Sequence, residues 1–238
     1  MLATTVRVLR QVRHDPRTVA LVVVVPAALV ALLAWVYDGT PVFDRVGAPM
    51  VALFPFTVMF LVTSLTTLRE RQSGTLERLL TTPLHRHELI GGYALAFGLL
   101  AAVQAAVVTT VARLVGLTVL GPLWAVLVVA VLVAVLGTAL GLLASAFAAT
   151  ELQAVQFMPA FVLPQLLLCG LLRPREELPV GLRELSSLLP LSHAVDAVTG
   201  IVGRTEVDSE VLASVAVVVG FAVLALAAGS LTLRRRTP

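Results

Sequence analysis

His87 and Glu88 begin a segment that starts like the zinc-protease motif H-E-x-x-H, so they are the first residues to test for chemistry. In that motif, two histidines one helical turn apart both bind the metal. Gly91 occupies the position of the second histidine in this chain. The pattern therefore lacks a ligand, and we expect His85 and His87 to be solvated at a membrane interface.

Other catalytic patterns are missing from the sequence. All 17 basic residues are arginine, so the lysine that a P-loop places on nucleotide phosphates is absent. No G-x-S-x-G nucleophile motif or paired-carboxylate arrangement appears. Cys169 is the only cysteine, which excludes an intrachain disulfide and a C-x-x-C site. We predict that the chain is not an enzyme and holds no metal or nucleotide itself.

The composition predicts an all-α protein that crosses a membrane several times. Of the 238 residues, 58% are hydrophobic and only 13% are charged, which is too apolar for a soluble globular domain. The high isoelectric point does not indicate nucleic acid as a partner. The arginines cluster beside apolar runs, where they contact membrane lipid headgroups or set the topology.

Six apolar runs predict six membrane spans within a single transmembrane domain, residues 1–238. Over residues 1–17, arginines alternate with apolar residues, which is typical of an interfacial amphipathic helix. The uncharged run that follows is longer than the apolar core of a signal peptide, so we interpret it as a retained span. The predicted spans are about 18–37, 49–68, 89–112, 123–149, 157–172 and 211–233.

The arginines also predict the orientation. Eleven of them lie in the N-terminal segment, in the loop after the second span and at the C-terminus, against six on the opposite side. Positively charged segments stay in the cytoplasm. We therefore expect both termini in the cytoplasm of a bacterium and the chain in its inner membrane.

Few polar residues fall inside the predicted spans. None of the spans contains Asp or Glu, and ion-coupled carriers normally use an intramembrane carboxylate, so a secondary carrier is disfavoured. Gln104 and Gln165 either hydrogen-bond to neighbouring helices or contact substrate, and helix packing is the favoured interpretation. The fourth span carries small residues at every fourth position, which lets another helix approach closely: these are Gly137, Gly141, Ser145 and Ala149.

The fifth predicted span is short, and an outer helical hairpin follows it at 178–202. Sixteen residues of straight helix rise about 24 Å, less than the roughly 30 Å of a hydrocarbon core. We expect the hairpin to pack through a leucine stripe onto the outer ends of the spans and to cap the pathway. The candidate path or gate residues are Gln104, Pro159, Pro164, Gln165, Leu185 and His193.

The most distinctive stretch is residues 69–88, between the second and third spans. Three of its leucines recur at i, i+3 and i+4 and so share one helical face, while Glu77 lies on another. Pro83 ends this pattern, because proline disfavours the α conformation of the residue before it. The pattern predicts a short amphipathic helix on the cytoplasmic side.

The same stretch resembles the coupling segment of ABC type-2 transporter permeases, which reads R-E-R-x-x-G-T-L-E-x-L-L-x-T-P-L. The matching residues are Arg69, Glu70, Arg71, Gly74, Thr75, Leu76, Glu77, Leu79, Leu80, Thr82, Pro83 and Leu84. The resemblance implies that this segment docks on a separate ATPase, with two ATPase subunits per transporter binding the ATP and Mg. It also implies a second permease copy or close homologue in a dimer.

By this resemblance the chain is the permease of an ATP-driven exporter, similar to short drug-resistance permeases. The charge-free spans and the few aromatic residues (nine Phe, two Trp and two Tyr) favour a lipophilic drug or lipid as substrate. A permease for lipid-linked glycans is the main alternative. A secondary carrier and a non-transporting membrane scaffold are further alternatives from other classes.

Overall fold

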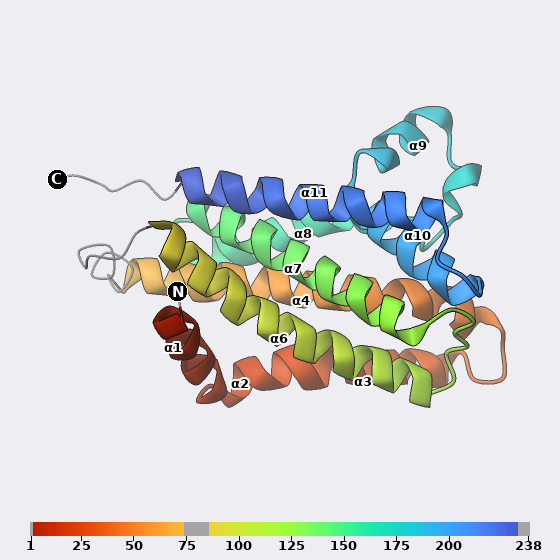
Figure 1. Cartoon of the computed structure of the whole chain (residues 1–238), viewed down its shortest axis with the longest axis horizontal. Helices are drawn as coiled ribbons and strands as arrows, with labels where there is room; N and C mark the ends of the chain where they lie inside the picture. The colour runs from red at the N-terminus through yellow and green to blue at the C-terminus, as the bar shows by residue number, and fades with distance from the viewer. Residues whose placement is uncertain (1, 74–85, 233–238) are drawn as a thin grey trace.

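The computed structural model describes residues 2–73 and 86–232, and these residues confirm the predicted all-α class (Figure 1). Within these two ranges the chain forms helices and no strands. In chain order the elements are α1 (Leu2–Arg13), α2 (Pro16–Val19), a π-helical turn (Ala20–Val24), α3 (Val25–Val36), α4 (Val42–Gln72), α6 (Arg86–Leu114), α7 (Leu123–Phe147), α8 (Glu151–Leu168), a 3-10 turn (Arg175–Glu177), α9 (Val180–Ser187), α10 (Pro190–Gly203) and α11 (Ser209–Thr232).

Five helical segments are long and apolar enough to cross a membrane, and the bent pair α9–α10 makes a sixth if it counts as one span. The five are Pro16–Val36, Val42–Gln72, Gly91–Leu114, Leu123–Phe147 and Ser209–Gly229. The fifth span predicted from the sequence falls mainly on α8, which is not one of the five. α8 has 18 residues, a rise of about 27 Å.

Helix α4 extends beyond the predicted span 49–68 at both ends. It runs from Val42 to Gln72, so Asp44 and Glu70 lie inside the helix. The predicted span 49–68 itself contains no carboxylate, whereas the longer helix that includes it carries Asp44 and Glu70 near its two ends. A hydropathy pattern ends a span at the first charges, whereas a helix continues wherever those charges find partners.

The core of the bundle is the close contact between α4 and α7. Gly137 and Gly141 on α7 lie against the backbone of Phe56 and Phe60 on α4, and a Cβ atom at either glycine would overlap a carbonyl oxygen of α4. The predicted small-residue stripe is thus confirmed as a surface for close helix approach at Gly137 and Gly141, whereas Ala149 lies beyond the end of α7.

Helix α1 lies at one end of the bundle, together with the end of α4 and the start of α6 (Figure 1). We call this the coupling end. One face of α1 is buried against the bundle through Thr4, Thr5, Val8 and Val12. Thr5 Oγ1 donates a hydrogen bond to the carbonyl oxygen of Gly92 on α6 at 3.1 Å. The predicted interfacial helix is thus fixed to the bundle along its length.

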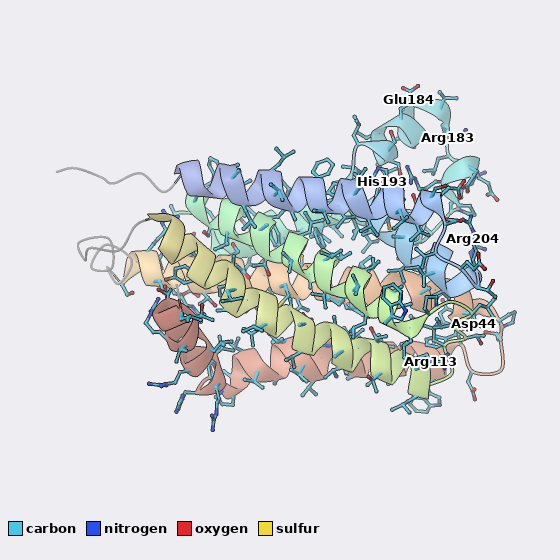
Figure 2. The ribbon with its side chains drawn as sticks, viewed as in Figure 1. Asp44, Arg113, Arg183, Glu184, His193 and Arg204 are labelled. Carbon is cyan, nitrogen blue, oxygen red and sulfur yellow. The ribbon has the colours of Figure 1, made fainter. Side chains whose placement is uncertain are left out.

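The far end carries the predicted helical hairpin, whose two helices meet at 87°. Helix α10 is largely buried, but α9 projects from the bundle, and Arg183 and Glu184 point away from it (Figure 2). Leu185 is 47% exposed. The expectation that the leucine stripe packs onto the ends of the spans is therefore wrong within this chain. Hydrogen bonds from the polar side of α9 attach this helix to the bundle instead. The hydroxyl of buried Ser186 donates to Leu168 O at 2.8 Å, and its oxygen lies 3.0 Å from Ser192 Oγ.

The loop between α6 and α7 closes the C-terminal end of α10. The N–H groups of Leu120 and Gly121 donate to the carbonyl oxygens of Val202 and Ile201 at 3.0 and 3.1 Å. These carbonyls lie in the last turn of α10, where a helix has no intrahelical donors left. A Cβ atom on Gly121 would overlap the Ile201 oxygen, so this cap requires glycine.

Candidate coupling interface

The last turn of α4 carries Arg69, Glu70 and Arg71, the first residues of the predicted coupling segment. Successive residues on a helix point about 100° apart, because a turn takes 3.6 residues. Three in a row therefore face three directions. In this structure each of the three side chains contacts a different part of the bundle.

Arg69 binds the start of α8. Its Nε and Nη2 donate to the two carboxylate oxygens of Glu151 at 2.9 and 3.0 Å, which is the fork geometry of a two-bond ion pair. The hydrogen bond from Arg69 lowers the pKa of the Glu151 carboxyl. Both side chains are about half exposed, so the pair adds at most about 1 kcal/mol to stability. Its main consequence is that it orients the end of α4 relative to α8.

Glu70 points into the bundle and is only 4% exposed. Its carboxylate accepts hydrogen bonds from Arg7 of α1, with Nη1 at 3.1 Å and Nη2 at 3.2 Å, and from the hydroxyl of Tyr93 of α6. Arg7 Nη2 also donates to the Tyr93 oxygen at 2.9 Å, and its guanidinium lies 5.9 Å from the centre of the ring. A buried carboxylate needs such partners, because an unpaired buried charge is strongly unfavourable.

Arg71 and Gln72 bind the connection between α7 and α8. The Arg71 guanidinium donates to the carbonyl oxygen of Ser145, and Gln72 Nε2 donates to that of Ala149 at 2.9 Å. The Thr150 hydroxyl caps α8 by accepting from the N–H of Gln153. The connection between α7 and α8 is therefore bound by side chains of α4 and also by the cap at the start of α8.

These contacts link the end of α4 to α1, α6, α7 and α8. The side chains involved are charged, amide or hydroxyl groups, whereas the bundle farther along is held by apolar packing. The end of α4 cannot move without breaking these hydrogen bonds or moving the helices that make them. The arrangement can therefore transmit a displacement at this end to much of the bundle.

Nine of the twelve residues that match the coupling segment lie between Ser73 and Arg86, outside the described residues. They are Gly74, Thr75, Leu76, Glu77, Leu79, Leu80, Thr82, Pro83 and Leu84, and their role stays a prediction. The structure does describe both flanks of this stretch. The preceding flank is the end of α4, and the following one is the start of α6, where Tyr93 binds Glu70.

The two predicted glutamines differ in their contacts. Gln165 on α8 is buried, donates to Phe161 O at 2.9 Å and accepts from the Leu191 N–H of α10 at 3.3 Å. Gln104 on α6 is fully buried, and neither of its amide atoms has a hydrogen-bond partner among the described residues. An interhelical hydrogen bond is thus present for Gln165 and not for Gln104.

The other candidate path residues lie on α8 and the hairpin. Pro159 and Pro164 are inside α8. His193 on α10 is within 2.9 Å of Ser187 O at the end of α9, and Leu185 is exposed on α9. The structure does not bring these residues and Gln104 together at one place, so their role in a path or gate stays a prediction. No group of three His, Cys, Asp or Glu among the described side chains is placed to bind a metal.

Sequence reasoning missed three members of this interface, namely Arg7, Tyr93 and Glu151. A signal was present for one of them, since a glutamate in the last turn of a span must find a cation if its side chain faces the bundle. The arginines of the N-terminal segment were the available cations. Which of these arginines pairs with Glu70 depends on how α1 packs against α4, and the sequence pattern does not specify that packing.

Comparison with known proteins shows which family this arrangement belongs to. The family model for the ABC-2 type transporter matches residues 1–202, so the chain belongs to this family of membrane transport permeases. The "Probable multidrug ABC transporter permease YbhR" of Escherichia coli strain K12 is 30% identical over 148 residues, which is 62% of this chain and 40% of that protein.

Two further relatives match a larger part of the chain at lower identity. The "Linearmycin resistance permease protein LnrN" of Bacillus subtilis is 26% identical over 186 residues, or 75% of this chain and 48% of that protein. The "ABC transporter G family member 20" of Dictyostelium discoideum is 28% identical over 159 residues, or 66% of this chain and 22% of that protein. The matches thus span less than half the length of each of these relatives.

Proposed function

We propose that the chain is the membrane subunit of an ATP-driven exporter that moves a lipophilic drug-like or lipid substrate out of the cytoplasm. A separate ATPase subunit binds the ATP and Mg and supplies the energy. Two permease chains and two ATPase subunits form the transporter. Residues 74–85 dock on the ATPase at the coupling end, which faces the cytoplasm.

The observation that supports this proposal best is the set of contacts made by Arg69, Glu70 and Arg71. The segment expected to receive the ATPase follows directly on these residues. An ATPase that pulls on this segment would act on a helix end bonded to four other helices. The coupling end therefore has the mechanical connections that energy transfer requires.

A lipophilic substrate is favoured by the apolar character of the bundle. The printed names of two relatives refer to multidrug transport and to linearmycin resistance, which supports a drug-like molecule for this chain. Most of the side chains on α3 and α11 are apolar, and many are exposed, so a hydrophobic substrate could reach the transporter through the bilayer.

The test is transport by the purified complex in proteoliposomes. The permease is co-purified with the ATPase subunit that it binds, and the complex is reconstituted with a fluorescent lipophilic dye. We expect dye movement to need ATP, Mg and the ATPase subunit, and to be unaffected by collapse of ion gradients. Movement by the permease alone, driven by a proton or sodium gradient, would contradict the proposal and favour a secondary carrier.

A further inference from the structure

Helix α1 has a second face, opposite the one that packs on the bundle. Four residues at spacings of three or four form a single stripe along α1, and a fifth, Arg17, follows on α2 after the break between the two helices. The first two are apolar, with Leu2 74% and Val6 50% exposed, and the next three are the exposed arginines Arg10, Arg13 and Arg17. A stripe that is apolar at one end and cationic at the other suits an amphiphilic ligand.

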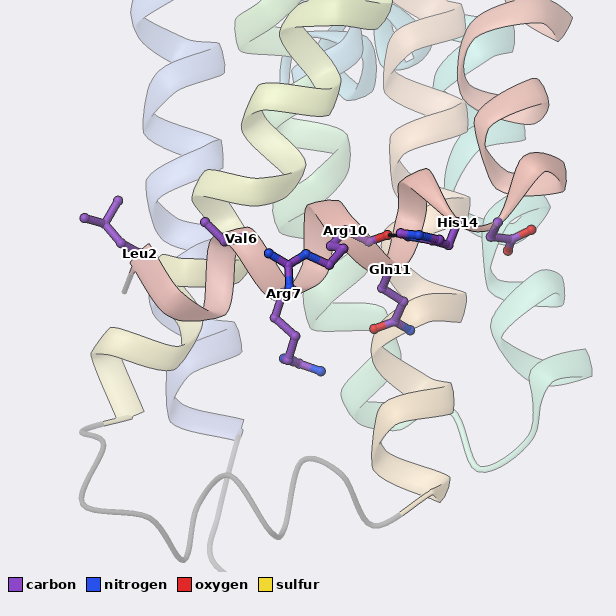
Figure 3. Close-up of a pocket in the computed structure, with 7 residues that line it drawn as sticks. Leu2, Val6, Arg7, Arg10, Gln11 and His14 are labelled. Atoms are coloured by element: carbon purple, nitrogen blue, oxygen red, sulfur yellow. Dashed lines mark hydrogen bonds between the residues drawn. The ribbon is translucent and has the colours of Figure 1, made fainter.

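A groove runs along this part of the molecule (Figure 3). Its volume is about 720 Å³, which is within the range of small-molecule sites, roughly 300–1,000 Å³. The lining includes Leu2, Val6, Arg10 and His14. The groove therefore joins the apolar part of the stripe to Arg10, the first of its arginines.

The positive charge of the stripe is not neutralised within the described part of the chain. The guanidinium groups of Arg10, Arg13 and Arg17 form no ion pair with any residue in it. Asp15 is the one carboxylate in the groove lining. Its oxygens already accept from the Arg17 and Thr18 N–H groups and from the Thr18 hydroxyl, which lower its pKa. The arginines remain available to an external anion.

The position of α1 indicates where that anion comes from. The helix is followed at once by the apolar segment Pro16–Val36, so its arginines lie where the hydrocarbon region begins. This is the depth of lipid phosphates, and basic clusters beside a span attract anionic lipids.

We propose that α1 carries a binding site for an anionic phospholipid. The phosphate lies against Arg10 and Arg13, and an acyl chain follows the apolar part of the groove at Leu2 and Val6. An amphipathic helix in the interface gains affinity from both contributions.

The test is native mass spectrometry of the purified, delipidated permease with phosphatidylglycerol or phosphatidylcholine of identical acyl chains. We expect the wild type to bind phosphatidylglycerol more tightly. A basic residue near an anionic lipid surface contributes about 1 kcal/mol, so Arg10→Gln and Arg13→Gln should each weaken phosphatidylglycerol binding about fivefold. Arg10→Lys should keep the preference, because it keeps the charge. Arg45→Gln is the matched control, since Arg45 is exposed on α4 at the far end.

Three results would overturn the proposal. The first is equal binding of the two lipids by the wild type. The second is an equal loss with Arg45→Gln, which would mean that net charge rather than this site sets the preference. The third is an unchanged lipid preference in Arg10→Gln and Arg13→Gln together with lost capture of the ATPase subunit, which would assign the stripe to a protein contact.

Discussion

Arg7 on α1 forms a two-bond ion pair with Glu70 on α4, 63 positions later in the chain, at 3.1 and 3.2 Å. Tyr93 of α6 completes the cluster by donating to the same carboxylate. Three helices thus meet at one buried charge, directly before residues 74–85. The N-terminal helix is thereby joined to the helix end that the proposed ATPase acts upon.

Glu70→Gln should destabilise the permease, because it removes the charge that Arg7 and Tyr93 bind. We expect a loss of about 2 kcal/mol, since Arg7 is partly exposed and recovers some hydration. The thermal midpoint in detergent should fall by about 5 °C. Glu210→Gln is the control, because Glu210 pairs with Arg204 at the exposed far end and should change stability by less than about 0.5 kcal/mol.

A double-mutant cycle makes this prediction sharper. Arg7→Gln combined with Glu70→Gln should cost clearly less than the sum of the two single substitutions, because each single change leaves a partner unpaired. Additive effects would show that the ion pair contributes nothing to folding.

The small-residue contact between α4 and α7 predicts a difference between two glycines. Gly137→Ala should lower the thermal midpoint, since the added methyl group would overlap the backbone of Phe56. Gly98→Ala on α6 is the matched control. Its Cβ would be 3.9 Å from Val135, so the gain in helix propensity, up to about 1 kcal/mol, should leave the variant as stable as wild type or more so. Equal midpoints for the two variants would show that the helices do not approach as closely as described.

The sequence predicted the helices well, because long apolar runs are decisive for membrane spans. The predicted spans 89–112 and 123–149 correspond to α6, Arg86–Leu114, and α7, Leu123–Phe147. The outer hairpin was also predicted, and it appears as α9 and α10. In both cases the prediction rests on features of neighbouring residues in the sequence, namely hydropathy and helical periodicity.

The contacts of the candidate site were not predictable in the same way. Periodicity shows that Leu182 and Leu185 share a face, but not what that face packs against, and both side chains are exposed in the structure. The burial of Glu70 depends on Arg7 and Tyr93, which are brought to it only by tertiary packing. The residues of the motif were recognised, whereas their partners required the fold.

The predicted orientation can be tested with single cysteines in a Cys169→Ala background. Ser73 follows α4 at the coupling end and Ser209 begins α11 at the far end, and both are exposed. We expect an impermeant thiol reagent to label the Ser209→Cys variant in intact cells and the Ser73→Cys variant only after lysis. Labelling of both from outside would place the two residues on the same side of the membrane, which would contradict the odd number of crossings predicted between them.

Glu77→Arg should separate ATPase docking from membrane insertion. The substitution reverses a charge in the predicted docking helix while keeping a good helix former, so ATPase stimulation and transport should fall with normal amounts of protein in the membrane. Glu206→Arg is the control, because Glu206 is exposed beyond α10 and should leave both activities unchanged. Wild-type activity of Glu77→Arg would show that the ATPase docks elsewhere.

The most direct test of energy transfer through the coupling end measures the number of substrate molecules moved per ATP hydrolysed by reconstituted complexes. It compares the wild type with variants in which the charge of Arg69, of Glu151 or of both is reversed. The pair is half exposed, so Arg69→Glu and Glu151→Arg should leave folding nearly intact. Each single change should lower this ratio clearly, because it breaks the contact between α4 and α8, and the double variant should restore most of it. Single variants that keep the wild-type ratio, or a double variant no better than either, would contradict the account.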